Sequence, residues 1–199
     1  MTREGRDEVV NEILGWWHAL YPRKIDGREI PGDSGARARL RRTQSINEAM
    51  LEPQFHVLYN IVRIDEKYLA KLAVLATTLP RLSSPDASGK PRFATLLGQT
   101  PGGDIPGEHD RARLSPLRFG NLLRAGNDPS RFAVALRRAI AILDGAPFNM
   151  RAFIRDVLWF TDETRRDWTF QYYQTWQARR GTSPNAGAPD ANTHSLQGN

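Results

Sequence analysis

The segment 128–143, DPSRFAVALRRAIAIL, shows the pattern that decides the fold. Phe132, Leu136, Ile140 and Leu143 recur at steps of four, four and three residues, so they share one face of a helix. The opening Asp-Pro pair is a typical helix start, because proline suits the first helical position. The segment therefore predicts an amphipathic helix with a buried apolar face and a solvated face that carries arginines.

Apolar residues recur at helical spacing through most of the chain on both sides of this segment. The predicted helices span about 9–20, 36–42, 45–51, 53–62, 65–79, 93–97, 115–125, 149–158 and 161–176. No strand is expected, because apolar–polar alternation never persists and the turn dipeptide Asp26-Gly27 is isolated. The sequence predicts an all-α protein, folded as a compact helical bundle.

A length of 199 residues suits one domain, or two small halves that share a core. Residues 1–80 form a predicted N-terminal helical half, and residues 115–180 form a predicted C-terminal helical half. Between them, residues 81–114 are rich in Pro and Gly and read as a long connection that contains the short helix 93–97. Residues 181–199 consist mainly of Gly, Pro, Asn, Ala and Ser, which predicts a disordered tail.

Several functional classes find no support in the composition. The chain has no cysteine, which excludes disulfide scaffolds, thiolate metal sites and cysteine nucleophiles. Its four histidines are scattered and no phosphate-binding loop occurs, so we expect no catalytic residue, metal or cofactor. Asp65-Glu66-Lys67 fits half of a metal-dependent nuclease motif, but a helix start explains the triplet better. We expect a soluble, cytoplasmic protein, because no apolar run approaches the length of a membrane span.

Positive charge is concentrated in two places. The net charge is +6, and 24 of the 28 cationic residues are arginine. Residues 111–138 hold seven arginines and one acid, so this segment alone carries the whole net charge. Residues 37–42 hold four more arginines and no acid. Such clusters are typical of a face that binds phosphate, although solvated helix faces are the ordinary alternative. Most of the tryptophans and tyrosines fall on apolar faces and are expected in the core.

An ordered series of motifs resembles the CasB family, the small subunit of the type I-E CRISPR effector complex, Cascade. The motifs extend over roughly residues 9–176 and are specific in their order and spacing rather than singly. They are Trp16-Trp17-x-x-Leu20, Gly35-Ala36-Arg37-Ala38-Arg39-Leu40-Arg41-Arg42, Pro53-x-Phe55-x-x-Leu58, Arg118-Phe119-x-x-Leu122-Leu123-Arg124-Ala125, Leu136-Arg137-Arg138 with Leu143, Asn149, Leu158-Trp159, Arg166-x-Trp168 and Tyr172-Tyr173.

The resemblance implies an all-helical subunit without catalytic activity. Members of this family lie as a pair along a guide-RNA complex and help hold the guide–target duplex and the displaced DNA strand in the R-loop. Their partners are the repeated backbone subunits, the large subunit that reads the PAM and, indirectly, a recruited helicase-nuclease. By motif position, the resemblance favours Arg42, Arg118, Arg124, Arg137 and Arg138, and it adds Lys67 more loosely. The full set of candidate nucleic-acid-binding residues is Arg37, Arg39, Arg41, Arg42, Lys67, Arg118, Arg124, Arg131, Arg137 and Arg138.

Two alternatives remain open from the sequence. The first is a free-standing basic helical module that binds DNA or RNA. The turn Gly126-Asn127-Asp128 would suit a helix-turn-helix, but residues 129–132 of the next helix are poor in side chains that read bases. The second alternative is an inert scaffold with an arginine-rich surface. A CRISPR operon around the gene would favour the family interpretation over both.

Overall fold

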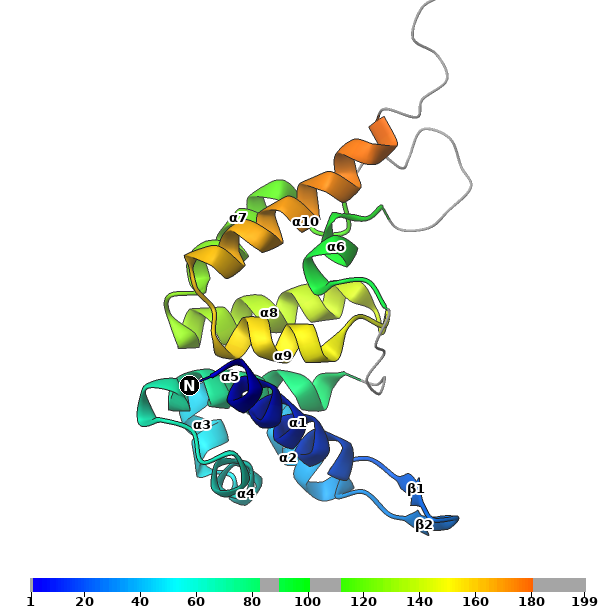
Figure 1. The fold of residues 1–199 in the computed structure, drawn as a ribbon, viewed down its shortest axis with the longest axis vertical. Coiled ribbons are helices and arrows are strands. Elements are labelled where there is room, and N and C mark those ends of the chain that lie inside the picture. Colours follow the sequence, from blue (N-terminus) through cyan, green and yellow to red (C-terminus); the bar gives the residue numbers. More distant parts are fainter. Residues whose placement is uncertain (1, 83–89, 101–111, 181–199) are drawn as a thin grey trace, which may run out of the picture.

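A computed structural model of the chain describes residues 2–82, 90–100 and 112–180. The described part is predominantly helical, as predicted (Figure 1). The elements before residue 83 are α1 (Arg3–Ala19), β1 (Arg23–Ile25), β2 (Arg28–Ile30), α2 (Ser34–Arg42), α3 (Ile46–Leu51), α4 (Pro53–Val62), η1 (Glu66–Tyr68), α5 (Leu69–Thr78) and η2 (Leu79–Arg81), where η denotes a 3-10 turn. The later elements are α6 (Phe93–Gly98), α7 (Pro116–Ala125), α8 (Pro129–Leu143), α9 (Met150–Leu158) and α10 (Asp162–Arg180).

Polar side chains cap several of the helix starts, including the predicted start at Asp128. Asp128 Oδ1 accepts hydrogen bonds from the backbone amides of the first turn of α8, at 2.9 and 3.1 Å. Asn149 caps α9 in the same way at 2.9 Å, and Ser45 caps α3 at 3.1 Å. Asp33 caps α2, with its Oδ1 accepting from the amide of Ala36 at 2.8 Å. These side chains satisfy amide groups that the first turn of a helix leaves unpaired.

The expectation that the chain has no strand is wrong for residues 23–30. β1 and β2 form a small antiparallel hairpin in which Arg23 pairs with Ile30. Its turn is the Asp26-Gly27 dipeptide, with φ of 49° and 78°. Positive φ at both central residues is what a tight two-residue hairpin requires. The Asp26-Gly27 dipeptide was the local signal for the hairpin, but it did not identify the hairpin, because the three-residue strands are too short to show an alternating pattern.

The helices pack in layers around one continuous hydrophobic core. In Figure 1, α8 and α9 lie between α5, below them, and α6, α7 and α10, above them. The central helix α5 packs against both α8 and α9, and every residue from Leu72 to Thr78 is buried. The segments before and after the predicted connection therefore share one core, and α8 lies in the middle layer.

The short helix predicted in the connection is confirmed as α6, which packs closely along α10. A side chain at Gly98 would lie 2.2 Å from the carbonyl oxygen of Tyr172, so this approach requires glycine. The predicted disordered tail, 181–199, lies outside the described residues, as do 83–89 and 101–111.

Most of the large aromatic side chains occupy the core, as predicted. Trp17, Trp168 and Tyr172 are almost completely buried. The ring of Tyr172 stacks on that of Phe119, with 4.0 Å between centroids, and joins α10 to α7. These buried rings cannot stack on nucleic-acid bases, so binding would depend on the cations.

Candidate nucleic-acid interface

The exposed side of α8 separates two grooves. The first groove, of about 310 Å³, lies where the C-terminal part of α8 meets α2 and η2. The second groove, of about 450 Å³, lies between α8 and α7. Ala141 lines both grooves, so they adjoin across the width of one helix. Arginines from α2, η2 and α8 line the first groove, and arginines from α7 and α8 line the second.

Three arginines converge in the first groove: Arg41, Arg81 and Arg137. Arg137 donates to the backbone carbonyl oxygens of Thr43 and Gln44, at 3.1 and 2.8 Å. Arg81 donates to the same Thr43 oxygen at 3.2 Å, and to a carbonyl of α5 at 3.0 Å. Two guanidinium groups are thus fixed by neutral carbonyl groups, which orient them without cancelling their charge.

The charges in the first groove act on one another. Burial lowers the pKa of Arg81, and the positive charges of Arg137 and then Arg41 lower it further. Burial also lowers the pKa of Arg137, which Glu48 partly opposes and Arg138 reinforces. All remain protonated at neutral pH, since arginine titrates far above it. Within the described residues, no carboxylate forms an ion pair with Arg41, Arg81 or Arg137.

The second groove carries two further arginines, Arg118 from α7 and Arg138 from α8. Both are exposed, and neither forms an ion pair with a described carboxylate. Its lining is otherwise largely apolar and includes Leu114 and Leu122. Arg42, exposed at the end of α2, also lacks an ion pair within the described chain. We call these residues the arginine row: Arg41, Arg42, Arg81, Arg118, Arg137 and Arg138.

Two other predicted residues of α2 have local structural contacts instead. The guanidinium of Arg37 lies 4.5 Å from the ring centroid of Tyr21, a cation–π contact. Arg39 forms an ion pair with Glu52 at 3.1 Å. Neighbouring side chains on a helix point in different directions, so a cluster in sequence is divided among several faces. The sequence could not separate these two residues from Arg41 and Arg42.

The remaining predicted residues lie outside the row. Lys67 pairs with Asp65 at 3.2 Å, and Arg131 pairs with Asp128 at 3.5 Å. Arg124 donates to Asn121 one turn earlier on α7. A role for Lys67, Arg124 and Arg131 in binding stays a prediction.

Sequence reasoning missed Arg81. It stands between Pro80 and Leu82, without another cation or a periodic pattern beside it. The turn η2 directs it toward residues 43 and 137, which are distant in sequence. No local signal marks such a residue, and only the packing of η2 against α2 reveals it.

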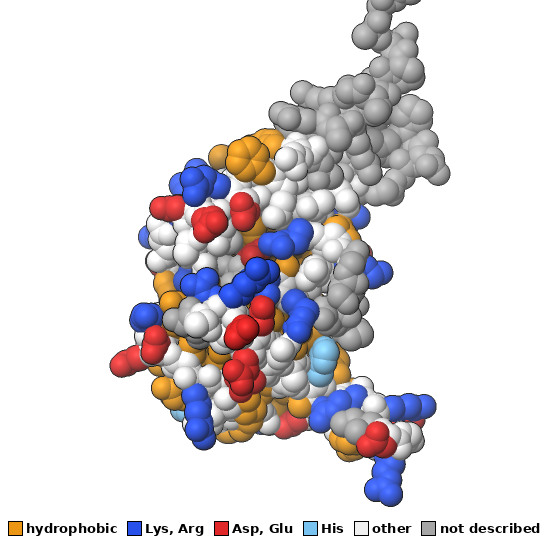
Figure 2. Space-filling model, in the orientation of Figure 1, with side chains coloured by type: hydrophobic (Ala, Val, Ile, Leu, Met, Phe, Trp, Pro, Cys, Tyr) orange, Lys and Arg blue, Asp and Glu red, His pale blue; other side chains and the backbone are white. Residues whose placement is uncertain are grey.

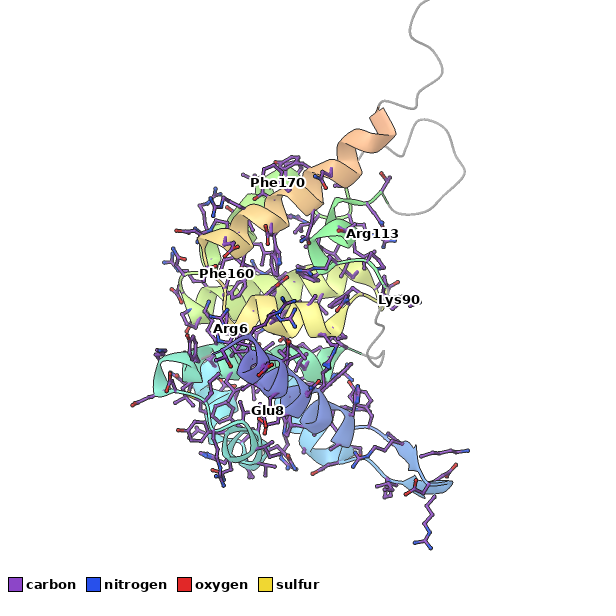
Figure 3. All side chains as sticks on the ribbon, in the orientation of Figure 1. Arg6, Glu8, Lys90, Arg113, Phe160 and Phe170 are labelled. Carbon is purple, nitrogen blue, oxygen red and sulfur yellow. The ribbon has the colours of Figure 1, made fainter. Side chains whose placement is uncertain are left out.

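A different surface, formed by α1, α9 and α10, has both signs of charge interspersed (Figure 2). Three ion pairs belong to these helices or link them to the chain before α6: Arg155–Asp7, Arg165–Asp162 and Arg92–Asp156. Arg6, labelled in Figure 3, projects from α1 to within 5.4 Å of the ring centroid of Trp159. We call this surface the paired face, since Arg155, Arg165 and Arg92 have carboxylate partners and Arg6 has an aromatic one.

The described residues contain no group of three or more His, Asp or Glu side chains that could hold a metal ion. Asp65 and Lys67 are exposed on the turn η1 and pair with each other, so the nuclease-like triplet is not on a strand. Among the described helices, none is both long enough and apolar enough to span a membrane.

Comparison of the chain with curated proteins and with solved structures gives no significant match. A family model described as CRISPR-associated protein Cse2 matches residues 36–173. That range is more than half of the chain and includes every arginine of the row. The chain therefore belongs to the Cse2 family of CRISPR-associated proteins, the CasB small subunits of the type I-E Cascade complex.

Proposed function

We propose that this protein is a non-catalytic Cascade subunit that binds nucleic-acid backbone in the R-loop. Its ligands would be the phosphates of the guide–target duplex and of the displaced DNA strand. The observation that carries the proposal is the arginine row, whose members lack carboxylate partners among the described residues. Charges that the protein itself leaves uncompensated are available to a polyanion.

The chemistry of the row suits backbone rather than bases. Guanidinium groups present a planar set of donors that matches phosphate oxygens. Trp17, Trp168 and Tyr172 are in the core, and the exposed ring of Phe170 belongs to α10, which contributes no residue to the row. In a guide-RNA complex, base pairing supplies the sequence specificity, and protein contacts to the backbone are sufficient. A displaced single strand likewise requires an electrostatic groove.

The partners follow from the same proposal. The row draws its residues from α2, η2, α7 and α8, which leaves other faces for a second copy of the chain and for the repeated backbone and large subunits. A free-standing helix-turn-helix is less consistent with the geometry, because α8 packs between α5 and α7. Arg131, in the first turn of α8, is also engaged by Asp128.

The experiment is the affinity of reconstituted Cascade for target DNA, measured with several unrelated guide–target pairs. The double variant Arg118→Ala/Arg138→Ala removes two charge-assisted contacts to phosphate, so we expect affinity at least about tenfold lower. The loss should be the same for every guide, because backbone contacts carry no base code. Arg155→Ala, which removes an arginine already paired with Asp7, is the matched control and should change affinity little.

Unchanged affinity in the double variant would contradict the proposal. A loss that depends on the target sequence would instead favour a protein that reads bases.

A further inference from the structure

The first groove has an apolar floor beside its three arginines. Leu82, Ile140, Leu143 and Phe148 line it, together with Met150. Its volume of about 310 Å³ is at the lower end of the range for small-molecule sites. These side chains are at most 9% exposed, so they offer a narrow apolar strip rather than a broad surface. A phosphate group alone would leave that strip uncovered, so the shape suits a ligand with both an anionic and an apolar part.

The arginines are arranged to receive an anion. Arg81 and Arg137 are each held by two backbone carbonyl contacts, which leave further N–H donors on each guanidinium. Arg41 is exposed and has no hydrogen bond within the described residues. The guanidinium groups of Arg81 and Arg137 are thus fixed before a ligand binds, which lowers the entropic cost of binding. The side chain of Arg41 can move to contact the ligand.

The groove does not neutralise its own charge. The only acid in its lining is Asp144, at the C-terminal end of α8, and it forms no ion pair with Arg41, Arg81 or Arg137. Burial and mutual repulsion disfavour the charged forms of Arg81 and Arg137, and the carboxylate of Glu48 offsets this only in part for Arg137. A bound anion would relieve both effects.

We propose that the first groove is a nucleotide site for a single strand, with one phosphodiester held by Arg41, Arg81 and Arg137. The sugar and base of the adjoining nucleotide lie on the floor formed by Leu82 and Phe148 and their neighbours. The inference rests on the proposed function, because it takes the strand to be the nucleic acid that the row binds. It adds a defined subsite and a binding residue, Arg81, to that function.

The site also joins distant parts of the chain. Arg41 and Arg81 belong to α2 and η2, whereas Arg137 belongs to α8. A phosphate held by all three therefore links the early helices to the middle layer. Because a ligand that binds only the folded state stabilises it, occupation of the site raises the melting temperature of the protein.

The test uses the free full-length chain and the thymidine dinucleotide pTpT as the probe. We expect pTpT to raise Tm by about 5–10 °C at a concentration about 100 times its Kd. Thymidine and inorganic phosphate, each offered alone, should bind more weakly than the dinucleotide, because each fills only one part of the groove. Equal binding of inorganic phosphate and pTpT would overturn the assignment of the floor to sugar and base.

Arg41→Gln is the principal variant, because it removes no hydrogen bond or ion pair that holds the fold. We expect about tenfold weaker binding of pTpT and an unchanged Tm without ligand. Arg81→Gln should also weaken binding, and it should lower the unliganded Tm because two backbone contacts are lost. Arg155→Gln, on the paired face, is the matched control and should bind pTpT as the wild type does.

Other outcomes separate this inference from the proposed function. Undiminished binding of pTpT by both Arg41→Gln and Arg81→Gln overturns the inference. If Arg118→Gln alone weakens pTpT, the nucleotide site is in the second groove, so the inference fails while the proposed function stands. If the Arg118→Ala/Arg138→Ala complex binds target DNA normally but Arg41→Gln weakens pTpT, the subsite is supported and the wider proposal fails.

Discussion

The arginine row and the paired face use the same residue type for different purposes. On the paired face, Arg92 and Asp156 lie 3.0 Å apart, and Asp156 also accepts from Trp168 Nε1 at 2.8 Å. In the row, Arg137 contacts only backbone carbonyls, and Arg138 has no ion pair within the described chain. Paired arginines hold helices together, whereas unpaired ones leave a positive surface. The contact partner of an arginine therefore indicates its role better than the number of arginines in its segment does.

The largest expected effect on stability comes from the paired face. Asp156→Ala leaves the Arg92 guanidinium and the Trp168 indole without their acceptor in a mostly buried place. We expect the free energy of unfolding to fall by about 3 kcal/mol, measured by urea denaturation. Asp156→Asn keeps one acceptor oxygen and should lose less. Wild-type stability in Asp156→Ala would show that this ion pair does not hold the helices.

Arg137 and Arg138 are neighbours on α8, but only Arg137 is held by hydrogen bonds to another segment of the described chain. Arg137→Ala removes two hydrogen bonds that join α8 to the end of α2, so the free energy of unfolding should fall by about 1–2 kcal/mol. Arg138→Ala removes none, and its effect should stay within about 0.5 kcal/mol. Chemical denaturation of both variants tests the contrast. An equal loss in the free energy of unfolding for both variants would mean that the hydrogen bonds of Arg137 do not stabilise the fold.

Lys71 is a cation of a third kind, held by rings and a carbonyl group. Its Nζ lies 4.6 Å from the ring centroid of Phe132, 5.5 Å from that of Phe160, and donates to the Gly126 carbonyl. Burial and, to a smaller extent, the charge of Arg165 lower the pKa of Lys71 to about 8, against a smaller opposing effect of Asp128.

The lowered pKa of Lys71 gives stability a definite pH dependence. An unfolded lysine titrates near 10.4, so between pH 8 and that value the unfolded chain binds more protons than the folded one. Wild-type stability should therefore rise across this window relative to Lys71→Met, by less than about 1 kcal/mol because the side chain is partly exposed. Thermal unfolding at pH 7, 8, 9 and 10 measures the difference. Parallel curves would contradict the lowered pKa.

Local patterns predicted the helices, and contacts between distant segments decided the site. The 128–143 helix was predictable because its period, proline and cap all lie within one segment. The hairpin at 23–30 was missed, since its strands are too short for a period to appear. The charge of segment 111–138 indicated Arg118, Arg137 and Arg138, although the same signal could not show which arginines have partners.

In residues 37–42, too, the sequence cannot show which arginines have partners. Four arginines in one short helix look equivalent in the sequence, yet Tyr21 and Glu52 engage two of them, whereas Arg41 and Arg42 have no ion pair within the described part of the chain. Arg81 shows no local signal at all. Tertiary packing determines which cations have partners and which remain available. The sequence could therefore name most members of the row as candidates, but it could not separate them from the arginines that have partners.

The most direct test of the central claim is the salt dependence of target-DNA binding by assembled Cascade. Each phosphate contact contributes about one counterion to the slope of log K against log salt concentration. Arg118→Ala and Arg138→Ala should each reduce that slope by about 1, whereas Arg155→Ala, on the paired face, should leave it unchanged. Identical slopes in all three variants and the wild type would contradict the claim that unpaired arginines form the nucleic-acid surface.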